Sequence, residues 1–315
     1  MSLFIKNVEL KSNFILAPMA GYSDFVLRTM CSDYGAGLVF TEMISSSALH
    51  YKNQKTIDLL KLGEEKCPVA CQIFGHNPEI MAEACASSYL SGFDIIDINM
   101  GCPARKIISN GDGSALLNDF ELSRKIIEAC VKATEKPITV KFRIGYTDDK
   151  IIAVEFAKMC EEAGASAITV HGRTTMQGYS GEVNYDVIKQ VKQAVSIPVF
   201  ANGNCKSKED ADRIFELTGA DGIMVGRGAI GSPEIFSELV YDKKADVDKL
   251  EQIKNHYRQI SDFYSETYAV KYLRSHIAYY LSGKYKNTNL VVSIMKMQKI
   301  SEIFNALDEF FATFK

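Results

Sequence analysis

No stretch of this chain reaches the roughly 20 consecutive apolar residues that a membrane-spanning helix requires. The first residues, MSLFIKNVELKSNF, lack the apolar core of a secretory signal peptide. Tryptophan is absent, and there is neither an internal repeat nor a low-complexity segment. These absences argue against membrane and fibrous classes. They predict a cytoplasmic protein with no membrane partner and no evident obligate protein partner.

The cysteines lack the spacing of a metal site. None of the eight forms a CxxC pair, and no histidine-rich segment accompanies Cys67 and Cys71. Zinc and iron–sulfur sites need several convergent ligands, so we expect no metal. Most of these cysteines lie in apolar or helical patterns, where cysteine behaves as a small buried hydrophobe. Cys102 differs, because it follows a glycine and precedes a proline in a turn.

The chain also has no large excess of positive or negative charge. The 36 basic and 39 acidic side chains leave a net charge of −3, so the surface as a whole does not attract polyanions. A nucleic-acid partner would have to be met by a local basic patch. The 47% hydrophobic and 24% charged residues are ordinary for a soluble globular protein, and 315 residues can form one large domain and a smaller one.

What the chain does contain is a regular alternation of strand and helix patterns. Helical spacing of apolar residues is clearest in 78–92, 119–136 and 208–220. Parallel strands joined by helices predict an α/β fold, a (β/α)8 TIM barrel. An open doubly wound sheet is the alternative, but no GxGxxG follows the first strand. The eight expected strands are FILAP (14–18), LVFTE (38–42), VACQIF (69–74), DIIDIN (94–99), ITVKFR (138–143), AITVHG (167–172), PVFANG (198–203) and GIMVGRG (222–228).

The pattern changes near residue 240. After the charged segment DKKADVDKLEQ, apolar residues recur three and four apart and no strand pattern remains. We expect a catalytic barrel domain over residues 1–240, followed by a small all-helical C-terminal domain over residues 241–315.

Polar side chains stand at the carboxyl ends of the expected strands, where barrel enzymes place their chemistry. Alternation puts Asp97 and Asn99 on one face of their strand, and Lys141 and Arg143 on one face of the next. A packed core does not need these groups, because burying an unpaired polar group costs roughly 1–3 kcal/mol or more. They imply a polar ligand or a dense hydrogen-bond network.

Three features of these ends have more than one interpretation. The glycine-rich loops at 201–204 and 225–228 suit either a phosphate or plain tight turns. Lys141 fits a Schiff-base lysine, an ion pair with Asp97 or Glu42, or a charge that stabilises a bound cofactor ring. His171 could act in the site or be satisfied in a network. We interpret His50, His76 and His256 as ordinary surface or helix residues.

Several segments together resemble the tRNA-dihydrouridine synthase family, with its bacterial B-type members most similar. The resemblance runs from about residue 5 to 240, and more weakly through the tail. It implies a flavin-dependent reduction of uridine to 5,6-dihydrouridine in tRNA, with FMN as cofactor and NADPH (or NADH) as reductant. The segments are LAPMAGYSD (16–24), CQIFG (71–75), DINMGCPARKI (97–107), GSALL (113–117), VKFRIGY (140–146), VHGRT with QGYSG (170–181), ANGN (201–204) and DGIMVGRGAIGSP (221–233).

The resemblance also implies roles for individual residues. Hydride would pass from the reduced flavin to uracil C6, and Cys102 would donate the proton to C5. An unperturbed thiol, with a pKa of about 8.5, is mostly protonated at neutral pH and can serve as the acid. Asn99 would orient the uracil. The flavin would be held by Ala17, Pro18, Met19, Gln72, Lys141 and His171, and its phosphate by Asn202, Gly203, Asn204, Gly226 and Arg227.

A tRNA substrate requires cations around the mouth of the barrel, since the base must leave its stack and the backbone is anionic. We expect Arg105, Arg143 and Arg173 to serve there, with Lys271, Arg274 and His276 from the tail. Helical spacing places Lys271 and Arg274 on one face. The family's Arg-Lys-His is Arg274-Ser275-His276 here. Three rival interpretations stay open: an FMN-dependent reductase of small pyrimidines or enoates, a non-catalytic RNA-binding relative, and an aldolase-like barrel.

Overall fold

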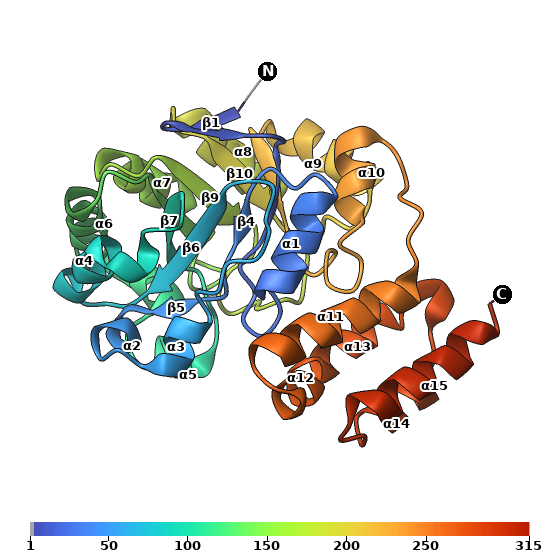
Figure 1. Cartoon of the computed structure of the whole chain (residues 1–315). Coiled ribbons are helices and arrows are strands. Elements are labelled where there is room, and N and C mark those ends of the chain that lie inside the picture. Colours follow the sequence, from blue (N-terminus) through green and yellow to red (C-terminus); the bar gives the residue numbers. More distant parts are fainter. Residues whose placement is uncertain (1–2, 315) are drawn as a thin grey trace.

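A closed barrel of eight parallel strands dominates the computed structural model, which describes residues 3–314 (Figure 1). The strands pair in the order β3-β11-β10-β9-β8-β7-β6-β4, and a parallel bridge from Ile15 to Leu38 closes the ring. This confirms the predicted barrel. The strands are β3 (Phe14–Leu16), β4 (Val39–Phe40), β6 (Val69–Phe74), β7 (Ile95–Met100), β8 (Ile138–Arg143), β9 (Ala167–His171), β10 (Val199–Asn202) and β11 (Gly222–Val225).

Helices surround the barrel and mostly begin at side-chain caps. Asp24, Asn77, Asp119, Asn184 and Ser207 each accept a hydrogen bond from a backbone N–H of the helix that follows. The long helices are α1 (Phe25–Asp33), α4 (Pro78–Ala86), α6 (Phe120–Ala133), α7 (Ala153–Glu162), α8 (Tyr185–Ala194) and α9 (Lys208–Thr218). Shorter elements are β5 (Ile44–Ser45), α2 (Ser46–His50), α3 (Gln54–Asp58), α5 (Arg105–Ile108) and α10 (Ile235–Tyr241).

The barrel interior changes from apolar to polar along its axis. An N-terminal hairpin of β1 (Leu3–Ile5) and β2 (Val8–Leu10), which the sequence analysis did not predict, contributes Ile5 and Leu10 to an inner cluster with Leu38, Ile95 and Phe200. Figure 1 shows this hairpin at one end of the barrel. Successive side chains on a strand alternate between faces, so the inward positions further along β7 are Asp97 and Asn99. The apolar end stabilises the barrel, and the opposite end is left for function.

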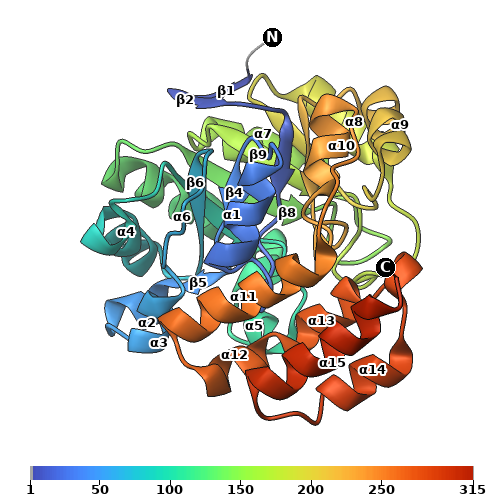
Figure 2. The same ribbon diagram turned by 45° about the vertical axis from the view of Figure 1, so that its right-hand side comes forward.

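Every element of the described chain after β11 is helical, and these helices lie beside the barrel (Figure 2). α11 packs against α1. The segment between α10 and α11 has no regular structure. The boundary at residues 240 and 241 stays a prediction. None of the described helices is long and apolar enough to span a membrane. The helices are α11 (Lys249–Phe263), α12 (Glu266–Tyr272), α13 (Arg274–Tyr280), α14 (Thr288–Ile294) and α15 (Ile300–Ala312).

The single helix expected to carry Lys271 and Arg274 is divided at Leu273, so that Lys271 lies in the last turn of α12 and Arg274 begins α13. Lys271 is exposed. Arg274 is half-buried and donates a hydrogen bond to the carbonyl of Met297, 3.1 Å away. Its guanidinium therefore ties α13 to the segment before α15 and does not stand free for RNA.

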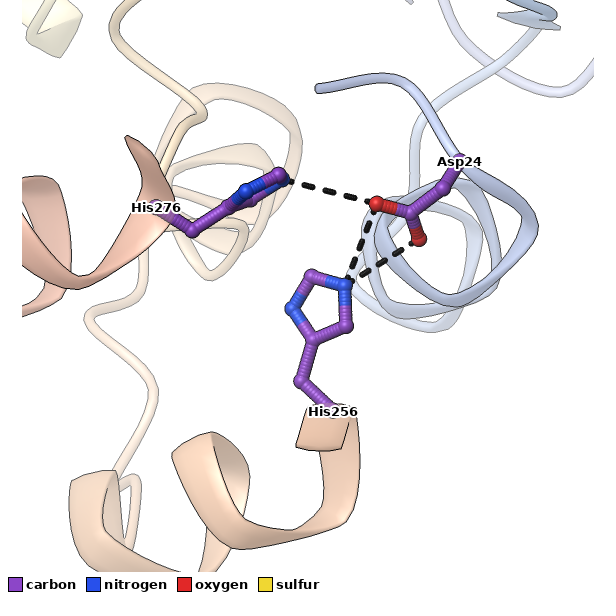
Figure 3. A group of neighbouring side chains, drawn as sticks. All are labelled: Asp24, His256 and His276. Atoms are coloured by element: carbon purple, nitrogen blue, oxygen red, sulfur yellow. Dashed lines mark hydrogen bonds and ion pairs between the residues drawn. The ribbon is translucent and has the colours of Figure 1, made fainter. Parts of the chain in front are cut away.

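His256 lies on helix α11, as one of the two expected settings, but it is not at the surface, and His276 is not exposed at the site where it was expected to meet RNA. Both are buried against Asp24, the cap of α1 (Figure 3). The Nε2 atom of His256 lies 3.1 Å from each Asp24 oxygen, and that of His276 lies 3.4 Å from Oδ2 and 3.3 Å from the carbonyl of Tyr22. The Nδ1 atom of His256 meets the Tyr280 hydroxyl at 2.9 Å. This hydrogen-bonded cluster joins the barrel to the helices.

Candidate active site

A cavity of about 580 Å³ opens at the carboxyl ends of the strands, a size typical of small-molecule and cofactor sites. Residues on or after seven of the eight barrel strands line it, and Tyr279 of α13 completes its wall. Most of the predicted site residues are brought together here. They are Ala17, Pro18, Met19, Asn99, Cys102, Lys141, Arg143, His171, Arg173, Asn202, Gly203, Asn204, Gly226 and Arg227.

Five predicted residues do not line the cavity: Gln72, Arg105, Lys271, Arg274 and His276. Arg105 lies exposed at the start of α5, beside the mouth. Conversely, sequence reasoning missed several lining residues. Met43 and Tyr22 could have been found only from their positions after β4 and β3. Tyr279 had no such indication, because it comes from a helix far along the chain. The missed residues include Ala20, Tyr22, Met43, Tyr179, Lys206, Ile230 and Tyr279.

The loops after β10 and β11 form an anion cradle. Within residues 3–314, no hydrogen bond uses the backbone N–H groups of Gly203, Asn204, Gly226, Arg227 or Gly228. Asn204 has a left-handed backbone, with φ of 55°. A Cβ on Gly228 would lie 2.6 Å from the carbonyl oxygen of Cys205, so glycine permits this close approach. Backbone N–H groups without partners on loops that line the cavity suit a phosphate.

Arg227 and Tyr179 stand at the rim of this cradle. The Arg227 guanidinium lies 4.8 Å from the Tyr179 ring centroid, within the range of a cation–π contact. Among the described residues, Arg227 has neither a hydrogen bond nor an acidic partner. Tyr179 is 60% exposed. An uncommitted guanidinium beside free N–H groups strengthens the anion site.

Lys141 and His171 lie deeper, on neighbouring strands. Burial lowers the pKa of Lys141 to about 8, with a further contribution from the charge of Arg143. Lys141 forms no ion pair or side-chain hydrogen bond with any described residue, so the predicted pairing with Asp97 or Glu42 is not formed. Burial and then Lys141 hold the pKa of His171 well below its usual value, so its ring is neutral at pH 7. The site thus holds one unpaired ammonium group next to a neutral imidazole.

Cys102 is the only one of the eight cysteines that is not buried. Partial burial raises the pKa of its thiol above the usual value, and the nearby Lys141 and Arg143 charges only reduce this effect. Asn99 accepts a hydrogen bond from the Cys102 N–H at 2.9 Å, and Ser114 donates one to its carbonyl at 2.9 Å. The geometry therefore presents a protonated thiol on a fixed backbone.

Gln72 lies behind the cavity wall and not on it. Its side chain is 0% exposed, and its amide lies between Asp97 and Asn99. The predicted contact of Gln72 with a cofactor edge stays a prediction; in the structure the Gln72 amide contacts Asp97 on one side and Asn99 on the other. Its link to the cavity runs through Asn99.

Arg143 and Arg173 also differ from the prediction that they meet RNA at the mouth. Only 2% of Arg143 and 3% of Arg173 is exposed. Arg143 donates to the carbonyls of Gly101, Thr174 and Gly178. Arg173 donates to the carbonyl of Gly181 and to Asn204. Both side chains brace the loops of the cavity, and both contribute positive charge to its interior.

A parallel barrel whose mouth holds a protonated thiol, an unpaired ammonium group and an anion cradle defines a (β/α)8-barrel enzyme with a site for an anionic ligand. The model of the family described as "Dihydrouridine synthase (Dus)" matches residues 15–314. The chain therefore belongs to the dihydrouridine synthase family.

Similar proteins extend this result. "Probable tRNA-dihydrouridine synthase" of Rickettsia conorii is 39% identical over 321 residues, covering 97% of each chain. "tRNA-dihydrouridine synthase B" of Pseudomonas putida is 41% identical over 289 residues, covering 89% of this chain and 86% of the relative. A solved structure, "Crystal structure of TcOYE with pHBA", is 11% identical, with a TM-score of 0.56 over 76% of this chain and 91% of that chain. This last likeness shows the fold alone.

Proposed function

We propose that this protein reduces uridine in tRNA to 5,6-dihydrouridine, with a bound flavin as hydride source and NADPH or NADH as reductant. The names of the relatives support the substrate. The single observation that carries the chemistry is the position of Cys102, an accessible and protonated thiol in the same cavity as the unpaired Lys141.

The cavity fits a flavin mononucleotide. The anion cradle formed by Gly203, Asn204, Gly226 and Arg227 would hold the phosphate, and Asn202 lies beside it. Ala17, Pro18 and Met19 offer a largely apolar wall for a flat ring. Lys141, which has no carboxylate partner, would compensate negative charge on that ring. When bound, the flavin supplies a hydride to the substrate.

Reduction of the uracil C5=C6 bond needs one hydride at C6 and one proton at C5. The Cys102 thiol donates that proton and becomes a thiolate, which then takes a proton from solvent. A thiol with a raised pKa is suited to this role, because it is fully protonated at neutral pH. Asn99 lines the cavity beside Cys102, so its side chain would lie against the base, while its NH₂ group and oxygen already bind Gln72 and the Cys102 N–H.

The substrate base must leave its stack to reach Cys102. Arg105 and Lys106 are exposed on α5 next to the Cys102 loop, and Lys271 is exposed on α12. These three cations are free to meet phosphates of the folded RNA. Tyr22, Tyr179 and Tyr279 offer aromatic surfaces around the opening, which suit an unstacked base.

The test is the Cys102→Ala variant. We expect it to retain the flavin spectrum and the oxidation of NADPH, and to lose most dihydrouridine formation on natural tRNA. Cys160→Ala is the control, because that cysteine is buried and does not line the cavity. Full turnover in Cys102→Ala would remove the thiol from its role. Colourless protein that binds tRNA would favour a non-catalytic relative, and a small-molecule reductase would oxidise NADPH on free pyrimidines without competition from tRNA.

A further inference from the structure

Three buried side chains form one layer across β6, β7 and β8, beneath the cavity floor. Gln72 pairs in register with Asp97, and Asp97 with Thr139. All three are buried. Asn99 lies two residues further along β7, in register with Lys141. The layer is polar although it adjoins the apolar interior of the barrel.

These side chains form a continuous chain of hydrogen bonds that ends at the Cys102 backbone. The Thr139 hydroxyl donates to Asp97 at 2.5 Å, and the Gln72 amide donates to the other Asp97 oxygen at 2.6 Å. The Asn99 side-chain NH₂ group donates to Oε1 of the Gln72 side chain at 2.8 Å. The Asn99 oxygen accepts from the N–H groups of Cys102 at 2.9 Å and Gly101 at 3.1 Å.

The direction of this chain is fixed at both ends. An ionised carboxylate only accepts hydrogen bonds, and a backbone N–H only donates. Gln72 must therefore turn its NH₂ group to Asp97, which leaves its oxygen for Asn99. Asn99 must then donate to Gln72 and present its oxygen to Cys102. A flip of either amide would place two donors or two acceptors together in a buried site, which is costly.

We propose that Asp97 and Gln72 are positioning residues that hold the Cys102 turn, through Asn99, in its reactive place. Their hydrogen bonds align the Asn99 oxygen with the backbone of the turn, and this alignment sets the position of the thiol at the cavity wall. The consequence for catalysis depends on the proposed function of Cys102. The positioning itself does not.

Asp97 has a second effect on the site, through charge. Its charge favours the ammonium form of Lys141, whereas burial and the Arg143 charge oppose that form. The groups that face Lys141 are thus Asp97 on β7, Arg143 on β8, His171 on β9 and Cys102 in the loop. Removal of the Asp97 charge shifts this balance toward the neutral amine.

The experiment measures alkylation of Cys102 by iodoacetamide in the purified protein, followed by peptide mass spectrometry. This thiol reports selectively, because the other seven cysteines are buried. Asp97→Leu removes the acceptor, and we expect alkylation to accelerate about fivefold, the factor that corresponds to one lost hydrogen bond. Asp97→Asn keeps an acceptor for Gln72, and its rate should stay near that of the native protein. Thr139→Val is the matched control, since it removes an Asp97 contact outside the path to Cys102.

A pH profile of kcat separates the effect of the Asp97 charge on Lys141 from the effect of its hydrogen bonds on the Cys102 turn. Asp97→Asn and Asp97→Leu both remove the charge, so the alkaline limit of kcat moves to lower pH in both, and Thr139→Val leaves it in place. Native alkylation in Asp97→Leu, or equal acceleration in Thr139→Val, would overturn the proposal. If Asp97→Leu does not fold, Gln72→Met breaks the same path and must accelerate alkylation. Altered alkylation in a protein that never reduces tRNA would keep the positioning role and reject the proposed function.

Discussion

Lys141 is the side chain whose protonation the cavity controls most directly, and its pH dependence can be predicted. Burial lowers its pKa to about 8. The ammonium form dominates below that pH and the neutral amine above it. In the proposed function this charge would stabilise the reduced flavin, so kcat should fall as the pH rises through about 8. Lys141→Met should lose most of the activity and this alkaline limb. A native profile that stays flat to about pH 10, the ordinary lysine value, would contradict the prediction.

The raised pKa of Asp97 predicts a pH dependence of stability and not of activity. Burial raises its pKa from 3.8 to about 6, although the hydrogen bonds from Gln72 and Thr139 oppose this. Between pH 3.8 and about 6 the native state therefore binds more protons than the unfolded state. The free energy of unfolding falls as the pH rises through this window. Charged Asp97 thus destabilises the protein at pH 7, by up to roughly 3 kcal/mol.

Asp97→Asn removes this pH-dependent cost. The difference in free energy of unfolding between variant and native protein should favour the variant more at pH 8 than at pH 4.5. Urea denaturation at both pH values measures it, and contributions from all other groups cancel in the comparison. A difference that is the same at both pH values would show that Asp97 keeps its ordinary pKa in the fold.

At the scale of elements, the cluster of Asp24, His256 and His276, called the joint below, connects α1 with α11 and α13 beside the cavity. Asp24 caps α1 through Oδ1 and also receives His256 of α11 and His276 of α13. Burial lowers the pKa of His256, so its ring is neutral at pH 7 and donates its Nε2–H to the carboxylate. The His276 and Tyr22 rings pack with centroids 5.0 Å apart. Because Tyr22 lines the cavity, the joint lies directly behind the active-site wall.

Paired variants at His276 test the joint. His276→Phe keeps a ring against Tyr22 but removes the donor to Asp24 and to the Tyr22 carbonyl. It should lower the free energy of unfolding by roughly 1–3 kcal/mol, the cost of buried groups left unpaired. His276→Gln can place an amide N–H near the same position and should recover part of this loss. Thermal and urea unfolding measure both variants, and equal stability of Phe and native protein would show that the contact contributes nothing.

At the scale of the whole molecule, the exposed cations proposed to meet RNA are Arg105 and Lys106 on α5 and Lys271 on α12. Charge reversal of Lys271 should weaken tRNA binding several-fold and flatten its salt dependence, since one phosphate contact is lost. It should leave the unfolding temperature unchanged, because Lys271 is exposed. Arg274→Ala should instead lower the unfolding temperature and leave tRNA binding unchanged, because the Arg274 guanidinium donates a hydrogen bond to the Met297 carbonyl. Filter binding across a salt series, with a melting curve for each variant, measures tRNA binding and stability. The same change in both variants would show that Lys271 and Arg274 do not have these separate roles.

Local periodicity and turn chemistry were enough to predict the eight strands, the helices between them and the polar residues at the strand ends. Alternation along β7 and β8 places Asp97, Asn99, Lys141 and Arg143 inward wherever the sheet closes, because successive side chains on a strand point to opposite faces. The glycines after β10 and β11 marked the anion cradle in the same way. These features depend on residues a few positions apart.

Only the tertiary structure decided which polar groups reach the ligand and which are already paired. Arg143, Arg173 and His276 looked free in the sequence, but the carbonyls and the carboxylate that bind them come from other elements. The Asp97–Gln72–Asn99 path needs strands β6 and β7 in one register, and Tyr279 reaches the cavity only because α13 packs there. Pairing of a buried polar group depends on neighbours distant in the chain, and spacing along the sequence does not record them.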